Sequence, residues 1–226
     1  MRLFTFGCSY TEYIWPTWSD IVAKDLGCEN HNYGKAGMGN QGIACRLVEA
    51  NRKHSFQTED IICIVWSSWT RVDLLKDEKW ITEGNILNSD YYSNEYLQKH
   101  WSVENDDIRN ETAILQGNAY IKQFTQDIFN GHITSVPNHL PGSNNIFPKT
   151  KCVYQDDSHP SVLEHMDYVE NTIYPSLGYH LKQSTKDWCS NMEIIIQQLK
   201  GENSRMSNLE LEDLILEHWK GRKSYV

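Results

Sequence analysis

This sequence of 226 residues lacks several features that mark particular classes of protein. No stretch approaches the roughly 20 apolar residues that a membrane-spanning helix needs, and no long apolar secretion segment precedes the first expected strand. We therefore expect a cytoplasmic protein that does not bind membranes, although export by another route would leave the same sequence. Basic residues are outnumbered, with 21 Lys and Arg against 30 Asp and Glu. Such an acidic chain is not expected to bind nucleic acid.

Cysteine pairs of the form Cys-x-x-Cys are also absent. The six cysteines are scattered along a chain without a visible secretory segment, so we expect all of them to be reduced. Cys63 stands in an apolar run and is expected to be a small buried side chain. Asp156, His159 and His165 are possible metal ligands, but helical spacing places His165 on another face of its helix. We therefore expect no metal and no cofactor.

Strand-like and helix-like segments alternate along most of the chain. Runs of β-branched and aromatic residues predict strands at 2–6, 29–33, 61–66, 132–136 and 153–154. Apolar residues at helical spacing predict helices at 15–26, 41–53, 113–129, 161–173 and 182–199. The alternation is typical of a parallel sheet covered by helices on both faces. We expect one α/β domain over residues 1–200, with about five strands in its central parallel sheet.

Two regions depart from this alternation. Residues 75–112 are polar and rich in aromatic side chains, and we expect them to form an irregular insertion. Residues 201–226 are expected to form a linker, a short amphipathic helix at 209–219 and a basic tail. The apolar side of that helix is broad enough to pack on its own domain or on a partner subunit, and we favour its own domain. The oligomeric state is not predicted.

Polar residues collect where the expected strands end. Ser9 follows the first strand, the loop 34–40 follows the second, Ser67–Arg71 follows the third, and His159 follows the last. Because the carboxyl ends of parallel strands meet at one edge of the sheet, catalytic groups gather there. A hydroxyl, an imidazole and a carboxylate are the three groups of a serine hydrolase. We therefore predict Ser9 as the nucleophile, His159 as the base and Asp156 as the acid.

Each of these residues also has an ordinary structural explanation. Ser9 would cap the helix that follows it, as serine often does. Asp157 or Ser158 would cap the helix that begins after His159, which would leave the imidazole on the surface. Asp157 also competes with Asp156 for the role of the acid, although it is nearer to the histidine in sequence.

The loop Asn32–Asn40 is rich in glycine. Acyl transfer passes through a tetrahedral oxyanion that needs preorganised hydrogen-bond donors. A glycine of this loop, whose backbone N–H can approach closely, and the side-chain amide of Asn40 are candidates for this role, while the alternative is a turn in which Asn40 caps the next helix. The loop has no Gly-Lys-Ser/Thr ending and fails the dinucleotide spacing, so it is not expected to bind phosphate groups.

Three segments together resemble the sequence blocks of the SGNH/GDSL hydrolases, namely Phe6–Thr11, Asn32–Asn40 and Asp156–Ser161. Their order and spacing match that family from Met1 to about Tyr174. The resemblance implies a flavodoxin-like three-layer α/β/α fold and a serine esterase or acyl hydrolase. It implies that Ser9 supplies both the nucleophile and, through its own N–H, one oxyanion donor. Gly37 would supply the second donor, with the base and the acid as assigned above.

Two positions depart from that family. Cys8 stands where the family often has Asp, but this side chain does no chemistry. The family also has an oxyanion asparagine after its third strand, and Trp69 falls near that position here. Removing one oxyanion donor costs roughly 100- to 1000-fold in rate. Ser67, Ser68 and Thr70 are candidates to replace it, and so is Asn40.

The residues after the third strand also bear on the substrate. Arg71 would bind a carboxylate or sulfate group of the substrate, or would pair with Asp73. Aromatic side chains collect at and after the same strand: Trp66, Trp69, Trp80, Tyr91, Tyr92 and Trp101. Such rings stack on sugars, but they also pack insertions onto cores. We expect a hydrolase of small acyl esters, such as acetyl groups on a carbohydrate. The alternatives are an acyltransferase with the same triad and a catalytically degenerate glycan-binding module.

Overall fold

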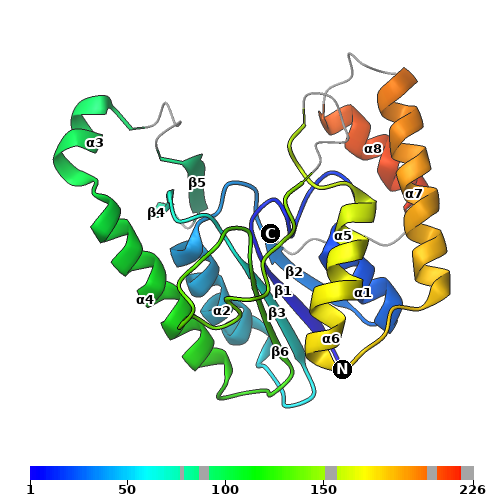
Figure 1. Cartoon of the computed structure of the whole chain (residues 1–226), viewed down its shortest axis with the longest axis horizontal. Helices are drawn as coiled ribbons and strands as arrows, with labels where there is room; N and C mark the ends of the chain where they lie inside the picture. The colour runs from blue at the N-terminus through cyan, green and yellow to red at the C-terminus, as the bar shows by residue number, and fades with distance from the viewer. Residues whose placement is uncertain (77–78, 87–91, 151–156, 203–207, 220–226) are drawn as a thin grey trace.

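The computed structural model describes the chain except residues 77–78, 87–91, 151–156, 203–207 and 220–226 (Figure 1). Its main sheet is parallel, with the strand order β2-β1-β3-β6. These strands are β1 (Leu3–Gly7), β2 (Asn30–Gly34), β3 (Ile61–Trp66) and β6 (Ile128–His132). The predicted α/β class with a central parallel sheet is confirmed. The sheet has four strands in the described residues, and the fifth predicted strand, at 153–154, lies outside them.

Helices cover both faces of this sheet, which gives three layers (Figure 1). One face carries α1 (Trp18–Leu26), α5 (Val162–Tyr168), the π-helical turn Val169–Ile173, α6 (Tyr174–Leu177), α7 (Gln183–Glu202) and α8 (Asn208–His218). The other face carries α2 (Asn40–His54) and α4 (Val103–Ile121). The arrangement agrees with a flavodoxin-like fold.

The two layers of core arise from alternation along the strands. In β3, Ile61 and Cys63 face one cluster of buried side chains, while Ile62 and Ile64 face the other. Successive side chains of a strand point to opposite faces, so a strand buried on both faces reads as a continuous apolar run. This explains why the sequence predicts a strand at 61–66.

Two helices begin where capping residues permit. Thr17 is the N-cap of α1, and its backbone N–H donates to Asp20 Oδ2 at 3.0 Å, so α1 begins at Trp18 rather than at the predicted residue 15. Ser161 caps α5 by accepting from the Glu164 N–H at 3.3 Å. Ser9, Asp157 and Ser158, which could also have been helix caps, therefore do not cap these two helices.

The segment 75–112 is not irregular throughout. A hairpin of β4 (Arg71–Lys76) and β5 (Lys79–Asn85) leads to α3 (Asn94–His100) and then to α4. Because α4 ends at Ile121, the predicted helix at 113–129 is wrong in its second half. The strand predicted at 132–136 is instead β6 at 128–132. The polar residues of β6 concealed its strand character.

The C-terminal helix α8 packs on its own domain. Leu211, Ile215 and Trp219 are buried in the same apolar cluster as residues of α1 and α7. The sequence favoured packing of this helix on its own domain, and the structure shows that packing. No helix in the described part of the chain has both the length and the apolar character needed to cross a membrane.

Candidate active site

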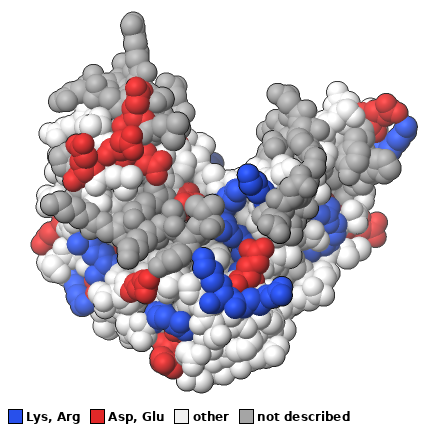
Figure 2. Space-filling view, turned by 180° about the vertical axis from the view of Figure 1, so that it is seen from behind, with Lys and Arg blue, Asp and Glu red and all other residues white. Residues whose placement is uncertain are grey.

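The candidate residues leave the sheet at one edge. Strands β1 and β3 are neighbours, with Phe6 opposite Ile64, so Ser9 and Ser67 emerge close to each other beyond their carboxyl ends. In open parallel sheets this switch point between adjacent strands is where ligands bind. The carboxyl ends of the strands lie between two lobes, one carrying β4, β5 and α3 and the other carrying α7 and α8 (Figure 1). Figure 2 shows the surface hollowed between these two lobes, with Lys or Arg side chains at the base.

The loop that carries Ser9 is held by buried hydrogen bonds. The Thr11 carbonyl accepts from Thr17 Oγ1 at 2.7 Å and from Asn32 Nδ2 at 3.0 Å. A Cβ atom on Gly7 would lie 2.0 Å from Thr11 Oγ1, so only glycine fits before this turn. Ser9 is itself buried and does not cap α1, whose N-cap is Thr17. The second sequence block thus anchors the first.

His159 forms a hydrogen-bonded pair with Asp157. The Nδ1 atom of His159 lies 2.8 Å from Asp157 Oδ1, which also accepts from the His159 backbone N–H at 2.9 Å. The Nε2 atom of the ring has no hydrogen-bond partner among the described residues. Asp156, the acid predicted from the sequence, lies outside the described residues. The carboxylate in contact with His159 is therefore that of the competing residue.

Asp157 is held in its ionised form. Burial raises the pKa of this carboxyl, but the hydrogen bonds from Tyr13 and from the backbone and ring of His159 outweigh burial and leave the pKa below its ordinary value. Lys200 Nζ lies 3.6 Å from Asp157 Oδ2. A carboxylate that stays ionised and accepts from Nδ1 of an imidazole fixes the ring so that Nε2 can accept a proton.

Tyr10 links the Ser9 loop to His159. Its ring centroid lies 6.1 Å from that of His159 and 5.1 Å from that of Phe147, both edge to face. The pKa of the Tyr10 hydroxyl is raised, mainly by burial. The positive charge of Arg71 acts in the opposite direction and lowers this pKa. The residue directly after Ser9 is thus bordered by the imidazole on one side and influenced by a cation on the other.

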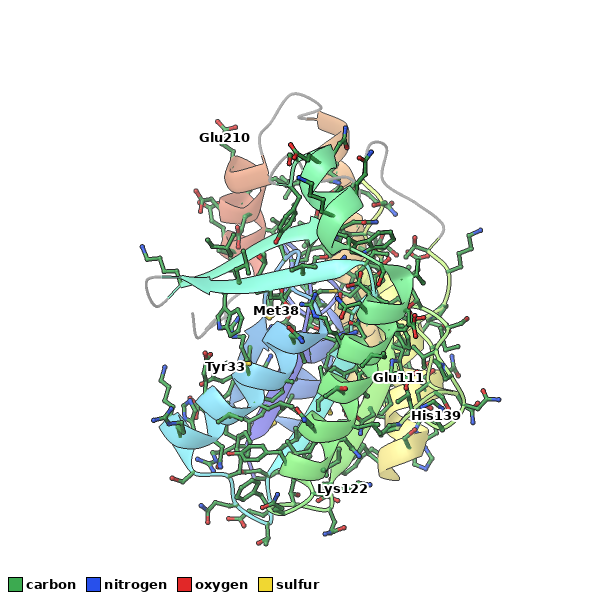
Figure 3. The ribbon with its side chains drawn as sticks, turned by 90° about the vertical axis from the view of Figure 1, so that its left-hand side faces the viewer. Tyr33, Met38, Glu111, Lys122, His139 and Glu210 are labelled. Carbon is green, nitrogen blue, oxygen red and sulfur yellow. The ribbon has the colours of Figure 1, made fainter. Side chains whose placement is uncertain are left out.

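The loop after β2 is shaped by its glycines and covered by the hairpin. Met38 N–H donates to the Lys35 carbonyl at 3.1 Å, which closes a turn with Gly37 at φ +77°. A Cβ atom on Gly37 would lie 2.5 Å from the Thr82 carbonyl of β5. Thr82 Oγ1 also donates to the Ala36 carbonyl at 2.9 Å. Figure 3 shows the hairpin crossing directly over the labelled Met38.

Asp73 ties the hairpin to the start of α2. Its carboxylate accepts from the backbone N–H of Gly39 and of Gly42, each at 2.8 Å. Negative charge at a helix N-terminus is favourable, so this bond fixes β4 on the helix. The pKa of Asp73 is nevertheless raised, because burial outweighs these two bonds and the influence of Arg71. No pattern in the sequence predicts this contact.

The side-chain amide of Asn40 is fully used in hydrogen bonds within the protein. Its Nδ2 donates to the Ser67 carbonyl at 3.2 Å and to Asn110 Oδ1 at 2.8 Å, and its Oδ1 accepts from the Ser67 N–H at 2.6 Å. It is also the first residue of α2 rather than its cap, which is Gly39. Both N–H groups of the Asn40 amide are therefore engaged within the protein.

The remaining predicted residues follow β3 in a row. The buried Ser67 hydroxyl and the Trp69 indole N–H have no hydrogen-bond partner among the described residues. Ser68 Oγ lies 3.3 Å from Thr70 Oγ1. Arg71 donates to the Met38 carbonyl at 3.2 Å and forms no ion pair within the described part of the chain. Its half-buried guanidinium therefore keeps unused donors.

His165 does not take part in this group. It is fully buried on α5, with its ring 5.3 Å from that of Phe147, and neither nitrogen has a partner in the described chain. Burial, and to a smaller extent His159, lowers its pKa to about 3, so the ring is neutral. Nor do the described residues bring three or more His, Cys, Asp or Glu side chains together as a metal site would require.

Tyr13 is a neighbour of the site that sequence reasoning missed. Its hydroxyl donates to Asp157 Oδ2 at 2.7 Å across 144 positions of the chain. Its only sequence signal is that it is an aromatic residue four positions after Ser9, in the same loop.

Comparisons with known proteins give few matches. No protein-family model matches the sequence, and no curated protein matches it either. Among solved structures, the acetyl xylan esterase Est2A from the rumen bacterium Butyrivibrio proteoclasticus is similar, with 11% identity and a TM-score of 0.37 over 90% of this chain and 64% of that one. Protein YxiM from Bacillus subtilis is similar with 11% identity and a TM-score of 0.34 over 97% of this chain and 56% of that one. The chain spans less than two thirds of the length of either structure. Likeness at this level does not identify an activity, which has to be inferred from the chain's own residues.

Proposed function

We propose that this protein is a serine-dependent hydrolase of small acyl esters, with Ser9, His159 and Asp157 as its triad. The observation that carries the proposal is the 2.8 Å contact between His159 Nδ1 and Asp157 Oδ1, next to a tyrosine that directly follows Ser9. An imidazole held in this way, with Nε2 unpartnered, has the arrangement of a general base. The proposal assigns the acid to Asp157 in place of Asp156.

The reaction follows from these three groups. Ser9 Oγ bonds to the acyl carbon while its proton passes to Nε2 of His159. The tetrahedral intermediate then loses the alcohol, which takes that proton, and the acyl group remains on Ser9. Water adds to the acyl carbon by the same route, so the acid leaves and Ser9 regains its proton. Asp157 stays ionised throughout and stabilises the imidazolium.

Three donors are available for the oxyanion. The backbone N–H groups of Ser9 and Gly37 have no acceptor among the described residues, which supports the roles implied by the family resemblance. We add the Arg71 guanidinium as the third donor, since it keeps free N–H groups. No donor is drawn from Asn40, because both of its amide N–H groups already donate within the fold. The arginine would compensate for the missing third-strand asparagine.

The substrate proposal is an acetyl or similarly small acyl ester of a carbohydrate. Trp69 stands half-buried just after β3, with an indole N–H that has no partner in the described chain. The indole N–H and the Ser67 hydroxyl are both shielded from solvent, so the proposal rests on the exposed part of the Trp69 ring. Such a ring stacks on the apolar face of a sugar.

Hydrolysis of p-nitrophenyl acetate by the purified protein tests this function. We expect turnover in the wild type and a loss to the rate of the buffer in Ser9→Ala. Ser190→Ala is the control and should keep the wild-type rate, because it removes an exposed hydroxyl of α7 that donates only to the Lys186 carbonyl. Equal rates from the wild type and Ser9→Ala would exclude the proposed nucleophile. A xylan oligomer that carries O-acetyl esters, assayed for released acetate, then tests the carbohydrate portion.

A further inference from the structure

The acid of the proposed triad has more partners than its histidine. One oxygen of Asp157, Oδ1, accepts from the ring and backbone of His159. The other oxygen, Oδ2, accepts from the Tyr13 hydroxyl at 2.7 Å and lies 3.6 Å from Lys200 Nζ. Both carboxylate oxygens therefore accept hydrogen bonds, and the carboxylate cannot rotate without losing bonds at each oxygen.

Tyr13 contacts the histidine as well as the acid. Its ring is stacked on the imidazole of His159, with the ring centroids 3.9 Å apart and an interplanar angle of 21°. One side chain thus holds both the carboxylate, through its hydroxyl, and the base, through its face. An aromatic face also favours the charged form of a stacked cation, which is the form the base takes during acyl transfer.

The position of Tyr13 is fixed by its neighbours. The edge of its ring meets Trp15, with centroids 4.5 Å apart at 76°. Trp15 is fully buried, and its indole N–H donates to the Pro160 carbonyl at 2.8 Å, directly after His159. Lys200, which also approaches Asp157, lies over the Trp15 ring, with its Nζ 4.6 Å from the ring centroid. Tyr13 and Trp15, in the loop that follows Ser9, therefore hold His159 in place, although His159 comes from the opposite end of the domain sequence.

We propose that Tyr13 is a positioning residue of this site, which orients Asp157 through its hydroxyl and the imidazole of His159 through its ring. The inference rests on the proposed function for its kinetic consequence, but the geometry of the acid and base does not depend on the substrate. Burial, together with Asp157, raises the pKa of Tyr13, so the phenol remains a donor at neutral pH. The hydroxyl and the ring have separable effects, since phenylalanine retains only the ring.

Two variants separate the two effects, and a third controls for stability. Tyr13→Phe is expected to lower kcat on p-nitrophenyl acetate roughly ten-fold with little change in KM, because a bond to a charged group is lost. Tyr13→Leu, which also loses the stacked ring, is expected to lower kcat roughly a hundred-fold. Tyr174→Phe is the matched control: its hydroxyl donates to Asp25 Oδ2 at 2.9 Å in the core, away from the sheet edge. It should lower the denaturant midpoint but leave kcat unchanged.

A readout that needs no substrate distinguishes this inference from the function on which it rests. In protein labelled with ¹⁵N-histidine, long-range ¹H–¹⁵N spectra report the tautomer of His159. We expect the Nδ1-protonated tautomer in the wild type and in Tyr174→Phe, and a mixture of tautomers in Tyr13→Leu, with an intermediate spectrum in Tyr13→Phe. Should Tyr13→Leu fail to fold by far-UV circular dichroism, Tyr13→Phe decides alone.

The outcomes divide cleanly. A changed tautomer in the Tyr13 variants of a protein that hydrolyses no ester would support the positioning role and refute the proposed function. A Ser9-dependent esterase whose Tyr13 variants keep the kcat and the His159 spectrum of the wild type would overturn the positioning role and leave the function standing. Loss of kcat in Tyr174→Phe equal to that in Tyr13→Phe would also overturn it, because the effect would then follow from stability.

Discussion

Asp157 Oδ1 lies 2.8 Å from Nδ1 of His159, two residues further along the same loop. This short span lets one residue bind both the ring and the backbone N–H of the other. The acid and the base therefore form a local unit, and only the serine has to come from a distant part of the chain.

The pair of adjacent aspartates allows a sharp test of the acid. Asp157→Asn is expected to lower kcat by about 10³- to 10⁴-fold, because an amide at this position favours the wrong tautomer of the histidine. Asp156→Asn removes the same charge one residue earlier and should stay within about three-fold of the wild type. Steady-state kinetics on p-nitrophenyl acetate measures both. A larger loss in Asp156→Asn would return the role to the residue predicted from the sequence.

Gly37 and Gly27 form a second matched pair. Both have positive φ, +77° and +66°, so the backbone strain of alanine alone should cost roughly 1 kcal/mol at either position. A Cβ atom at Gly27 would meet nothing within 4 Å, whereas at Gly37 it would lie 2.5 Å from the Thr82 carbonyl. We expect Gly27→Ala to keep its esterase activity and Gly37→Ala to lose at least ten-fold, because β5 must shift. Denaturation and kinetics on the same samples check this. Equal activities would argue against Gly37 as an oxyanion donor.

Arg71 is expected to matter for the transition state more than for the fold. Arg71→Met should lower kcat roughly 100-fold, since one oxyanion donor is removed, with little change in KM or in the denaturant midpoint. Arg52→Met changes an exposed arginine of α2 and serves as the control. If Arg71 instead bound an acidic group of the substrate, neutral esters would be hydrolysed normally by the variant. Comparison of a neutral ester with a carboxylate-bearing ester decides between the two roles.

Buried His165 should make the protein sensitive to acid. Its pKa in the folded state is lowered to about 3 by burial and His159, whereas in the unfolded chain it is about 6.5. The unfolded state therefore binds a proton that the folded state does not. The stability contribution is fully present above the unfolded pKa and is lost as the pH falls from about 6.5 toward 3, at up to about 1.4 kcal/mol per pH unit.

Urea unfolding between pH 7 and pH 4 measures this effect. The wild type should lose stability steadily over the range, and a His165→Phe variant should lose less. His180→Phe, which alters an exposed histidine, should behave as the wild type. Parallel curves for wild type and His165→Phe would contradict the expected titration.

Much of the fold could be predicted because the sheet is buried on both faces. Residues 3–6 and 61–66 are continuous stretches of apolar and β-branched residues, as expected of strands buried on both faces. Strand β6 was misplaced because it contains Asn130 and Gly131. Asn130 is accommodated there by two partly buried hydrogen bonds: its Oδ1 accepts from Trp66 Nε1 and its Nδ2 donates to Asn118 Oδ1, each at 3.0 Å. Such pairings cannot be read from one strand alone.

The candidate site was likewise predictable from the sequence only in part. Ser9 and His159 were visible because local motifs mark them, whereas the contacts of Tyr13 and Asp73 join segments far apart in the sequence. Asn40 was predicted as a donor from its place after a glycine-rich loop, but its amide is directed to Ser67 by the packing of α2 against the end of β3. Position in the chain indicated which residues reach the edge of the sheet, and only the packed structure shows which bonds they form.

Covalent labelling with a fluorophosphonate probe tests the central claim most directly, because the probe reacts with an activated serine whatever the natural substrate. Peptide mapping by mass spectrometry should place the adduct on Ser9 in the wild type. We expect no adduct in Ser9→Ala and much slower labelling in His159→Ala and Asp157→Asn. A folded wild-type protein that leaves Ser9 unlabelled, under conditions in which a known serine esterase reacts fully, would contradict the proposed triad.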